Sequence, residues 1–194
     1  MSIQTAHPNG HFYSPVTNPS ELSARLDELY PTNPRAVGVV FDDLAIERAL
    51  LDVLAPMLTA YDYPELGPAD TELSHFYTQN SQFSWLDSRA LFAFLRSWQP
   101  ARIVEVGSGY SSLLMADVNQ RFLGGRSKIE CVEPYPRPFL RRTDLAISLI
   151  EQRVQEIPLA FFESLEANDL LFIDSSHVCK TGSDVNYLYL QILP

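Results

Sequence analysis

The stretch RIVEVGSGYSS, residues 102–112, decides the fold of this 194-residue chain. Its first five residues are mostly apolar and β-branched, which predicts a buried strand, and glycines follow at positions 107 and 109. Glycines between a strand and a helix let the backbone approach a nucleotide ligand closely. Two features depart from the dinucleotide-binding pattern: Glu105 lies inside the strand, and Ser112 stands where the third glycine would be.

From residue 85 onward, segments typical of helices and of strands alternate along the chain. Helices are expected over 85–99, 110–125, 137–146 and 158–168 and from 182 onward, and strands over 101–109, 128–134, 147–155 and 169–174. In the first helix, the spacing of Leu91, Phe94, Leu95 and Trp98 predicts a buried face, with Asp87 opening the helix. This alternation predicts an α/β, Rossmann-like, doubly wound parallel sheet with helices on both faces.

Residues 1–84 have a different composition, and we expect them to form an N-terminal helical arm beside the domain formed by residues 85–194. This half is rich in prolines and turn formers, with helical patterns over 19–30 and 41–61. Ser20 is the expected cap of the first pattern, and Pro56 is expected to kink or end the second.

The charge balance narrows the classes of partner. The formal net charge is −10, which opposes nucleic-acid binding, and the basic cluster 137–142 is interpreted as a solvated helix face. No apolar run is long enough to cross a membrane, and the first residues do not resemble a secretion signal. Cys131 lies in an apolar run and is expected to be a buried thiol. We therefore expect a soluble, cytoplasmic protein without membrane or nucleic-acid partners.

Glu105 indicates the charge of the ligand. A carboxylate near the mouth of a buried strand is costly unless a cation or good donors meet it. It would repel a pyrophosphate and attract a ligand that carries an ammonium and a sulfonium, which points to S-adenosylmethionine.

Four motifs in order resemble those of class I S-adenosylmethionine-dependent methyltransferases, over residues 85–194 and closest to the small-molecule O-methyltransferase-like branch. They are VEVGSGYSS after the first strand, IECVEP in the second, RVQEIP after the third and LLFIDSSHV in the fourth. The resemblance implies a bound S-adenosylmethionine, with cofactor contacts at Glu105, Gly107, Ser108, Gly109, Ser111, Glu133, Val154, Gln155 and Asp174. Within this set, Glu133 would take the ribose hydroxyls, and Val154 and Gln155 would border the adenine.

The mechanism implied by the resemblance is in-line transfer of the sulfonium methyl to an oxygen or nitrogen of a small-molecule acceptor. Asp174 and His177 are the candidate catalytic residues, since a base must remove the acceptor's proton. In metal-dependent relatives a divalent ion does this; Asp174 would be its first ligand, but the later ligands have no counterpart here. Phe83 and Trp85 are candidates for the wall of the substrate pocket.

Each of these residues also has a purely structural interpretation. Glu105 could be a salt-bridged strand end, Glu133 could equally serve the ribose of NAD, and Gln155 could be an ordinary surface residue. Asp174 could be a plain strand-end acid and His177 a hydrogen-bonded loop residue. Phe83 and Trp85 could simply pack the approach to a helix.

The family's sheet continues with a fifth strand and an antiparallel pair, which this sequence does not contain. The chain is therefore expected to be a truncated version of the fold whose fourth strand forms an exposed edge, and a homo-oligomer covering that edge is expected. Three function classes stay open: a small-molecule methyltransferase, a non-catalytic remnant that binds a nucleoside or a partner, and an NAD-type oxidoreductase or epimerase.

Overall fold

In the computed structural model the chain forms two compact units. The sheet unit comprises residues 40–151 and 165–173, and the terminal unit comprises residues 1–39, 152–164 and 174–194. The structure describes residues 7–24, 48, 52, 54–69 and 72–194. Most of the helix expected over 41–61, and the end of the one expected over 19–30, lie outside the described residues.

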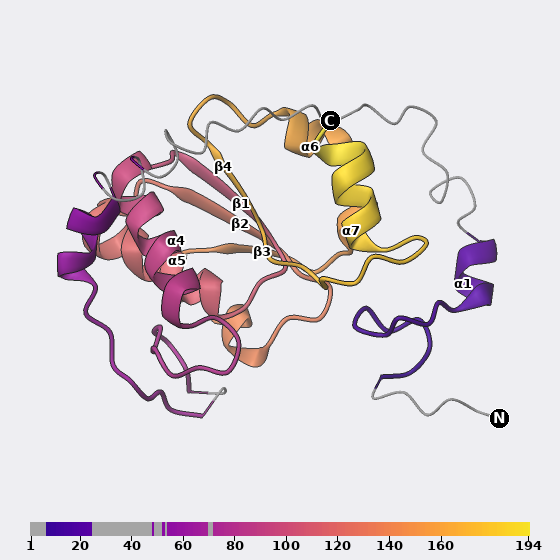
Figure 1. Cartoon of the computed structure of the whole chain (residues 1–194), viewed down its shortest axis with the longest axis horizontal. Helices are drawn as coiled ribbons and strands as arrows, with labels where there is room; N and C mark the ends of the chain where they lie inside the picture. The colour runs from indigo at the N-terminus through magenta and orange to yellow at the C-terminus, as the bar shows by residue number, and fades with distance from the viewer. Residues whose placement is uncertain (1–6, 25–47, 49–51, 53, 70–71) are drawn as a thin grey trace. The chain divides into compact units, whose positions relative to one another are not determined.

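The sheet unit is built on four parallel strands, which confirms the α/β, Rossmann-like, doubly wound fold class (Figure 1). The strands are β1 (Arg102–Val106), β2 (Lys128–Val132), β3 (Ser148–Ile150) and β4 (Leu170–Ile173), in the order β3-β2-β1-β4. Val106 is in register with Val132 of β2 and Ile173 of β4, so the carboxyl ends of these three strands lie level. In a doubly wound sheet this edge is where ligands bind.

Helices α4 (Trp85–Trp98) and α5 (Tyr110–Phe122) pack against each other in the sheet unit (Figure 1). Helix α5 ends as expected: Gly124 and Gly125 both have positive φ, and the amide of Gly125 donates to the carbonyl of Asn119. The 3-10 helix η2 (Ala55–Ala60) packs on α4.

The buried face of α4 differs from the expected one. Leu91, Phe92 and Leu95 are buried, whereas Trp98 is 55% exposed and stacks on the half-buried Phe94. The reason is tertiary: the ring of Phe92 lies edge-on to aromatic rings from the η2 region and from α5. The helical spacing was compatible with either face, and these aromatic contacts select one of them.

Two residues expected to open helices, Ser20 and Asp87, do not cap them. Asn18, not Ser20, caps α1 (Pro19–Ser23), because Pro19 occupies the first helical position and the Asn18 side chain accepts from the Ser20 amide. Helix α4 begins at Trp85, and Asp87 lies within its first turn. Pro56 lies in the first turn of η2, where a missing N–H costs little.

The helix expected over 137–146 is wrong: only the 3-10 turn η3 (Pro138–Arg141) forms there. Pro136 and Pro138 remove two backbone donors, and Phe139 and Leu140 are buried. The segment is thus an anchored turn and not a solvated helix face. The strand expected over 147–155 also shortens to β3, and the chain then enters the 3-10 helix η4 (Val154–Glu156).

The terminal unit contains α1, η4, α6 (Leu159–Glu163), α7 (Asp184–Tyr187) and the π-helical turn η5 (Leu188–Ile192). Helix α6 confirms the short helix expected after residue 158, and α7 with η5 confirms the last one. Within this unit α7 contacts η4, and α6 contacts η5, where Leu188 is fully buried.

Candidate functional site

The two glycines of the turn between β1 and α5 have different roles. Gly107 has φ +86°, a left-handed conformation that favours glycine. Gly109 has φ −173°, extended backbone that any residue adopts. Of these two glycines, only Gly107 therefore has a conformation that requires glycine. A Cβ added at Gly109 would meet no atom within 4 Å. Open space therefore lies beside the loop, where a ligand can approach.

Glu105 is fully buried at the carboxyl end of β1 and is surrounded by the chain's own donors. Its carboxylate accepts from Ser111 Oγ at 2.5 Å, from Ser112 Oγ at 2.5 Å and from Cys131 Sγ at 3.2 Å. Burial raises the pKa of Glu105, and the hydroxyl donors oppose this without cancelling it. Ser112 also accepts from the Gly109 amide at 3.0 Å, so Glu105, Ser112 and the glycine loop form one hydrogen-bonded chain.

This arrangement bears on two predicted cofactor contacts. Ser111, whose side chain is buried, directs its hydroxyl to Glu105. The hydroxyls of Ser111 and Ser112, in the first turn of α5, donate to Glu105, and this turn is where a dinucleotide enzyme would hold pyrophosphate. Contacts from Glu105 and Ser111 to a cofactor stay predictions.

Glu133 links the turns that follow β1 and β2. Its Oε2 accepts from the amide of Ser108 at 3.2 Å, and its Oε1 accepts from the amide of Tyr135 at 2.8 Å. The Glu133 amide donates to Ile150 O of β3 at 3.0 Å, which fixes its backbone. The Ser108 hydroxyl is buried beside Glu105 and lowers the pKa of that carboxyl, but it lacks a hydrogen bond of good geometry to the described residues. The structure thus brings Glu133 and the glycine loop together.

Asp174 and His177 form a hydrogen-bonded pair in the terminal unit. Asp174 directly follows the last residue of β4, and its Oδ1 lies 2.8 Å from His177 Nε2. The His177 side chain is 73% exposed, and its backbone is left-handed, with φ +57°. A non-glycine residue in this conformation is strained, and such strain is frequent at functional sites.

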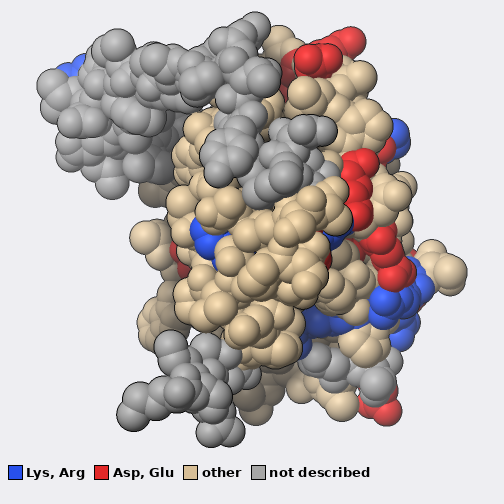
Figure 2. Space-filling view, turned by 90° about the vertical axis from the view of Figure 1, so that its right-hand side faces the viewer, with Lys and Arg blue, Asp and Glu red and all other residues tan. Residues whose placement is uncertain are grey.

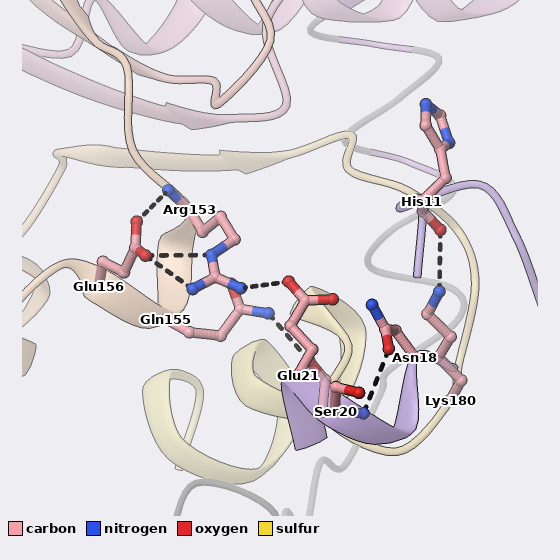
Figure 3. A network of polar contacts seen from close by, with 9 residues as sticks. His11, Asn18, Ser20, Glu21, Arg153, Gln155, Glu156 and Lys180 are labelled. Carbon is pink, nitrogen blue, oxygen red and sulfur yellow. Dashed lines mark hydrogen bonds and ion pairs between the residues drawn. The ribbon is translucent and has the colours of Figure 1, made fainter. Parts of the chain in front are cut away.

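Val154 and Gln155 belong to η4 in the same unit. Val154 is buried, and the amide of Gln155 donates to the Gly182 carbonyl at 3.1 Å (Figure 3). Gln155 therefore braces the loop before α7. The predicted adenine contacts of both residues are neither supported nor opposed by this arrangement.

The two candidate pocket aromatics differ sharply in exposure. Phe83 is 6% exposed and meets Phe172 of β4 edge to face, with ring centroids 6.1 Å apart. The side chain of Asn80 fixes the backbone there, accepting from the Phe83 amide at 2.6 Å. Phe83 is a core residue, in agreement with the packing alternative. Trp85 is 81% exposed, with φ +49°.

Sequence reasoning missed several contacts around these residues. Cys131 is the register partner of Glu105, a placement that follows once β1 and β2 are paired side by side. No local signal indicates that Lys180 Nζ donates to the carbonyl of His11 at 2.9 Å (Figure 3) and to that of Ser14 at 2.5 Å. Nor does one indicate the ion pair of Arg153 with Glu21 at 3.3 Å. These contacts fasten residues 7–24 within the terminal unit.

The surroundings of the candidate residues can be compared with what a metal ion and an adenosine ligand each require. Among the residues that the structure describes, no group of three His, Cys, Asp or Glu side chains is arranged to hold a metal ion. Asp174 has His177 as its hydrogen-bond partner but no cluster of ligands around it. An adenosine ligand needs space and a ribose acceptor. Open space lies beside Gly109, and the carboxylate of Glu133 accepts from the amide of the preceding residue, Ser108.

The surface charges are mixed. On the face drawn in Figure 2, uncharged residues make up most of the described surface, and the basic side chains lie in separate groups. Of the helices within the described ranges, none has the length and apolar character required to cross a membrane.

The chain is similar to a protein of an archaeon. An uncharacterized protein of Archaeoglobus fulgidus is 40% identical over 168 residues, which cover 83% of this chain and 74% of the relative. No family model matches the chain, and no solved structure matches it significantly.

Proposed function

We propose that this chain, which belongs to the same family as the Archaeoglobus fulgidus protein, binds S-adenosylmethionine and transfers its methyl group to an oxygen or nitrogen of a small-molecule acceptor. The observation that carries the proposal is the hydrogen bond from the Ser108 amide to Glu133. It fixes a carboxylate after β2 against the glycine loop after β1. In doubly wound folds an acid at this place accepts from the ribose hydroxyls of an adenosine ligand.

Glu105 supports S-adenosylmethionine over a dinucleotide. A pyrophosphate at the first turn of α5 would lie next to a carboxylate that already accepts from Ser111 and Ser112. Like charges repel strongly in a buried site, whereas the ammonium of a methionine moiety would be attracted. An NAD-type activity is therefore the less favoured alternative.

In this proposal the bound cofactor supplies an activated methyl group, and the chain's own residues orient the acceptor and accept its proton. The Asp174 carboxylate accepts a hydrogen bond from His177 Nε2, which assigns the proton of the neutral ring to Nε2. The lone pair for the acceptor's proton then lies on Nδ1. Asp174 would stabilise the ring once it is charged.

The test is a calorimetric titration of the full chain with S-adenosylhomocysteine and, separately, with NAD. We expect the first to bind and the second not to bind. Glu133→Gln removes the charge and one acceptor, and charge-assisted bonds contribute about 1.5–3 kcal/mol each, so the affinity should fall at least about tenfold. Glu151→Gln is the matched control, because Glu151 is an exposed acid that follows β3. NAD binding at equal or better affinity, or an unchanged affinity in Glu133→Gln, would contradict the proposal.

A second candidate is a nucleoside-binding protein without methyl transfer, and the enclosure of Glu105 favours it. If both oxygens of Glu105 keep their internal donors, the methionine part of the cofactor gains little from this residue. Adenosine would then bind about as tightly as S-adenosylhomocysteine. A clear preference for S-adenosylhomocysteine in the same titration would favour the methyltransferase.

The remaining partner and location predictions are part of the same proposal. A divalent metal is a variant of it, tested by repeating the titration with added Mg²⁺. A formal net charge of −10 disfavours nucleic acid, and the free thiols of Cys131 and Cys179 fit a reducing cytoplasm. In the described sheet β4 pairs on one side only, with β1, so we propose that a second copy of the chain covers this edge. Sedimentation at micromolar concentration would contradict the dimer if it showed only monomer.

A further inference from the structure

Asp184, the first residue of α7, holds the turn that carries the Asp174–His177 pair. Its Oδ2 accepts from the Ser176 amide at 2.9 Å, and its Oδ1 accepts from Ser176 Oγ at 2.5 Å. Ser176 is 5% exposed, so these bonds are largely shielded from water. Both oxygens of one carboxylate therefore hold one residue of the turn, and all of these residues belong to the terminal unit.

The helix behind Asp184 is itself anchored. Ser183 caps α7 by accepting from the Asn186 amide at 3.2 Å, and the helix continues into η5, where Leu188 is fully buried. The ammonium of Lys180 attracts Asp184 through its charge, but its hydrogen bonds go to backbone carbonyls of the N-terminal segment. Asp184 thus provides a fixed point for the turn.

His177 depends on this fixed point. It directly follows Ser176, its φ is +57°, and its ring is 73% exposed, so packing does little to hold the ring in place. A left-handed histidine relaxes to negative φ unless the surrounding structure prevents it. Relaxation would turn the ring away from Asp174, which lies 2.8 Å from Nε2.

We propose that Asp184, acting through Ser176, is the positioning residue that keeps His177 Nε2 on Asp174. The inference rests on the proposed function, in which the Asp174–His177 pair needs an ordered ring with Nδ1 available to the acceptor. A carboxylate suits this role because Ser176 presents two donors, N–H and O–H, and each carboxylate oxygen of Asp184 accepts from one of them.

The test uses the full chain with isotope-labelled histidine and records the ring nitrogen resonances of His177 at one fixed pH. Asp184→Ala removes both acceptors of Ser176, and in this variant we expect the resonances to move to the positions seen in Asp174→Asn, where the partner of Nε2 is altered directly. Ser176→Ala keeps the amide bond to Asp184 and should give a smaller displacement in the same direction. This variant also serves if Asp184→Ala fails to fold.

Ser164→Ala is the control in the same unit, because it removes the hydrogen bond from Ser164 Oγ to the Phe161 carbonyl at the end of α6 and leaves Ser176, Ser183 and Asp184 in place. It should leave the His177 resonances unchanged. His177 resonances that stay at wild-type positions in Asp184→Ala, or that move equally in Ser164→Ala, would overturn the positioning role. Both outcomes are read without any cofactor.

If the chain methylates an acceptor, Asp184→Ala should lower kcat by up to ~100-fold, the cost of a misplaced group, while the affinity for S-adenosylhomocysteine stays within twofold of wild type. A loss of affinity with unchanged kcat would contradict the inference. Failure of the wild-type chain to bind S-adenosylhomocysteine would contradict the proposed function only. The resonance experiment tests the positioning of His177 by Asp184 independently of any cofactor.

Discussion

Replacing Glu105 by glutamine separates the structural and the ligand-binding roles of this buried acid. Glutamine has nearly the same shape, and the hydroxyls of Ser111 and Ser112, which lie 2.5 Å from the two carboxylate oxygens, can each act as donor or acceptor. The two serine bonds can therefore persist in the variant, with one of them reversed. What the substitution removes is the charge.

The effect on stability follows from the direction of the pKa shift. Burial raises the pKa of Glu105 above its ordinary value of 4.5, so the unfolded chain releases this proton at a lower pH than the folded chain does. The stability that this carboxyl contributes is fully present below about pH 4.5 and is lost as the pH rises through the pKa that Glu105 has in the folded chain. Within that window one proton changes the free energy of unfolding by at most about 1.4 kcal/mol per pH unit.

At neutral pH, Glu105→Gln should thus be at least as stable as the wild type. Glu105→Ala should be less stable by about 2–6 kcal/mol, because it leaves the buried hydroxyl donors of Ser111 and Ser112 without an acceptor at about 1–3 kcal/mol each. The assay is urea unfolding followed by circular dichroism from about pH 4 to about pH 8. Subtracting the glutamine profile from the wild-type profile cancels the titration of the other acids.

Parallel pH profiles of stability for the wild type and Glu105→Gln would refute the raised pKa of the buried Glu105. Stability of Glu105→Gln as low as that of the alanine variant would refute the preserved serine bonds. A titration of the same variants with S-adenosylhomocysteine then tests the ligand. If the ammonium lies against Glu105, the glutamine variant binds more weakly although it folds at least as well.

Three further predictions test neighbouring features. Gly107→Ala should destabilise the chain by ~1–3 kcal/mol in urea unfolding, because Gly107 has φ +86°. Gly109→Ala should leave stability within ~0.5 kcal/mol and weaken S-adenosylhomocysteine binding measured by calorimetry, because its Cβ would enter open space beside the loop. Equal losses of stability in the two variants would contradict this. Phe83→Ala should lower the free energy of unfolding by ~3–5 kcal/mol, because the Phe83 ring is buried, and Trp85→Ala should lower it by less than ~0.5 kcal/mol, because Trp85 is 81% exposed. Urea unfolding measures both, and the reverse order would contradict the burial of Phe83. Lys180→Met should speed proteolysis within residues 7–24, because it removes two hydrogen bonds to that segment, and an unchanged cleavage rate would refute the fastening.

Much of the candidate site could be predicted because its residues follow strands. Once β1 and β2 are recognised as parallel neighbours, their carboxyl ends must lie at one edge, which places the residues after Val106 and Val132 there. Glu133 and the glycine loop are joined as this reasoning predicts, by the bond from Ser108. The pairing of Asp174 with His177, three residues apart, is of the same local kind.

The sequence by itself determined the alternation of strands and helices, the end of α5 at its glycines and the left-handed Gly107, because each depends on a few adjacent residues and on backbone sterics. Only the tertiary structure decided which face of α4 is buried and which donors enclose Glu105. It also decided that Lys180 holds residues more than 160 positions away. Such contacts depend on the packing of distant segments and on the desolvation of particular atoms, and neither leaves a periodic pattern in the sequence.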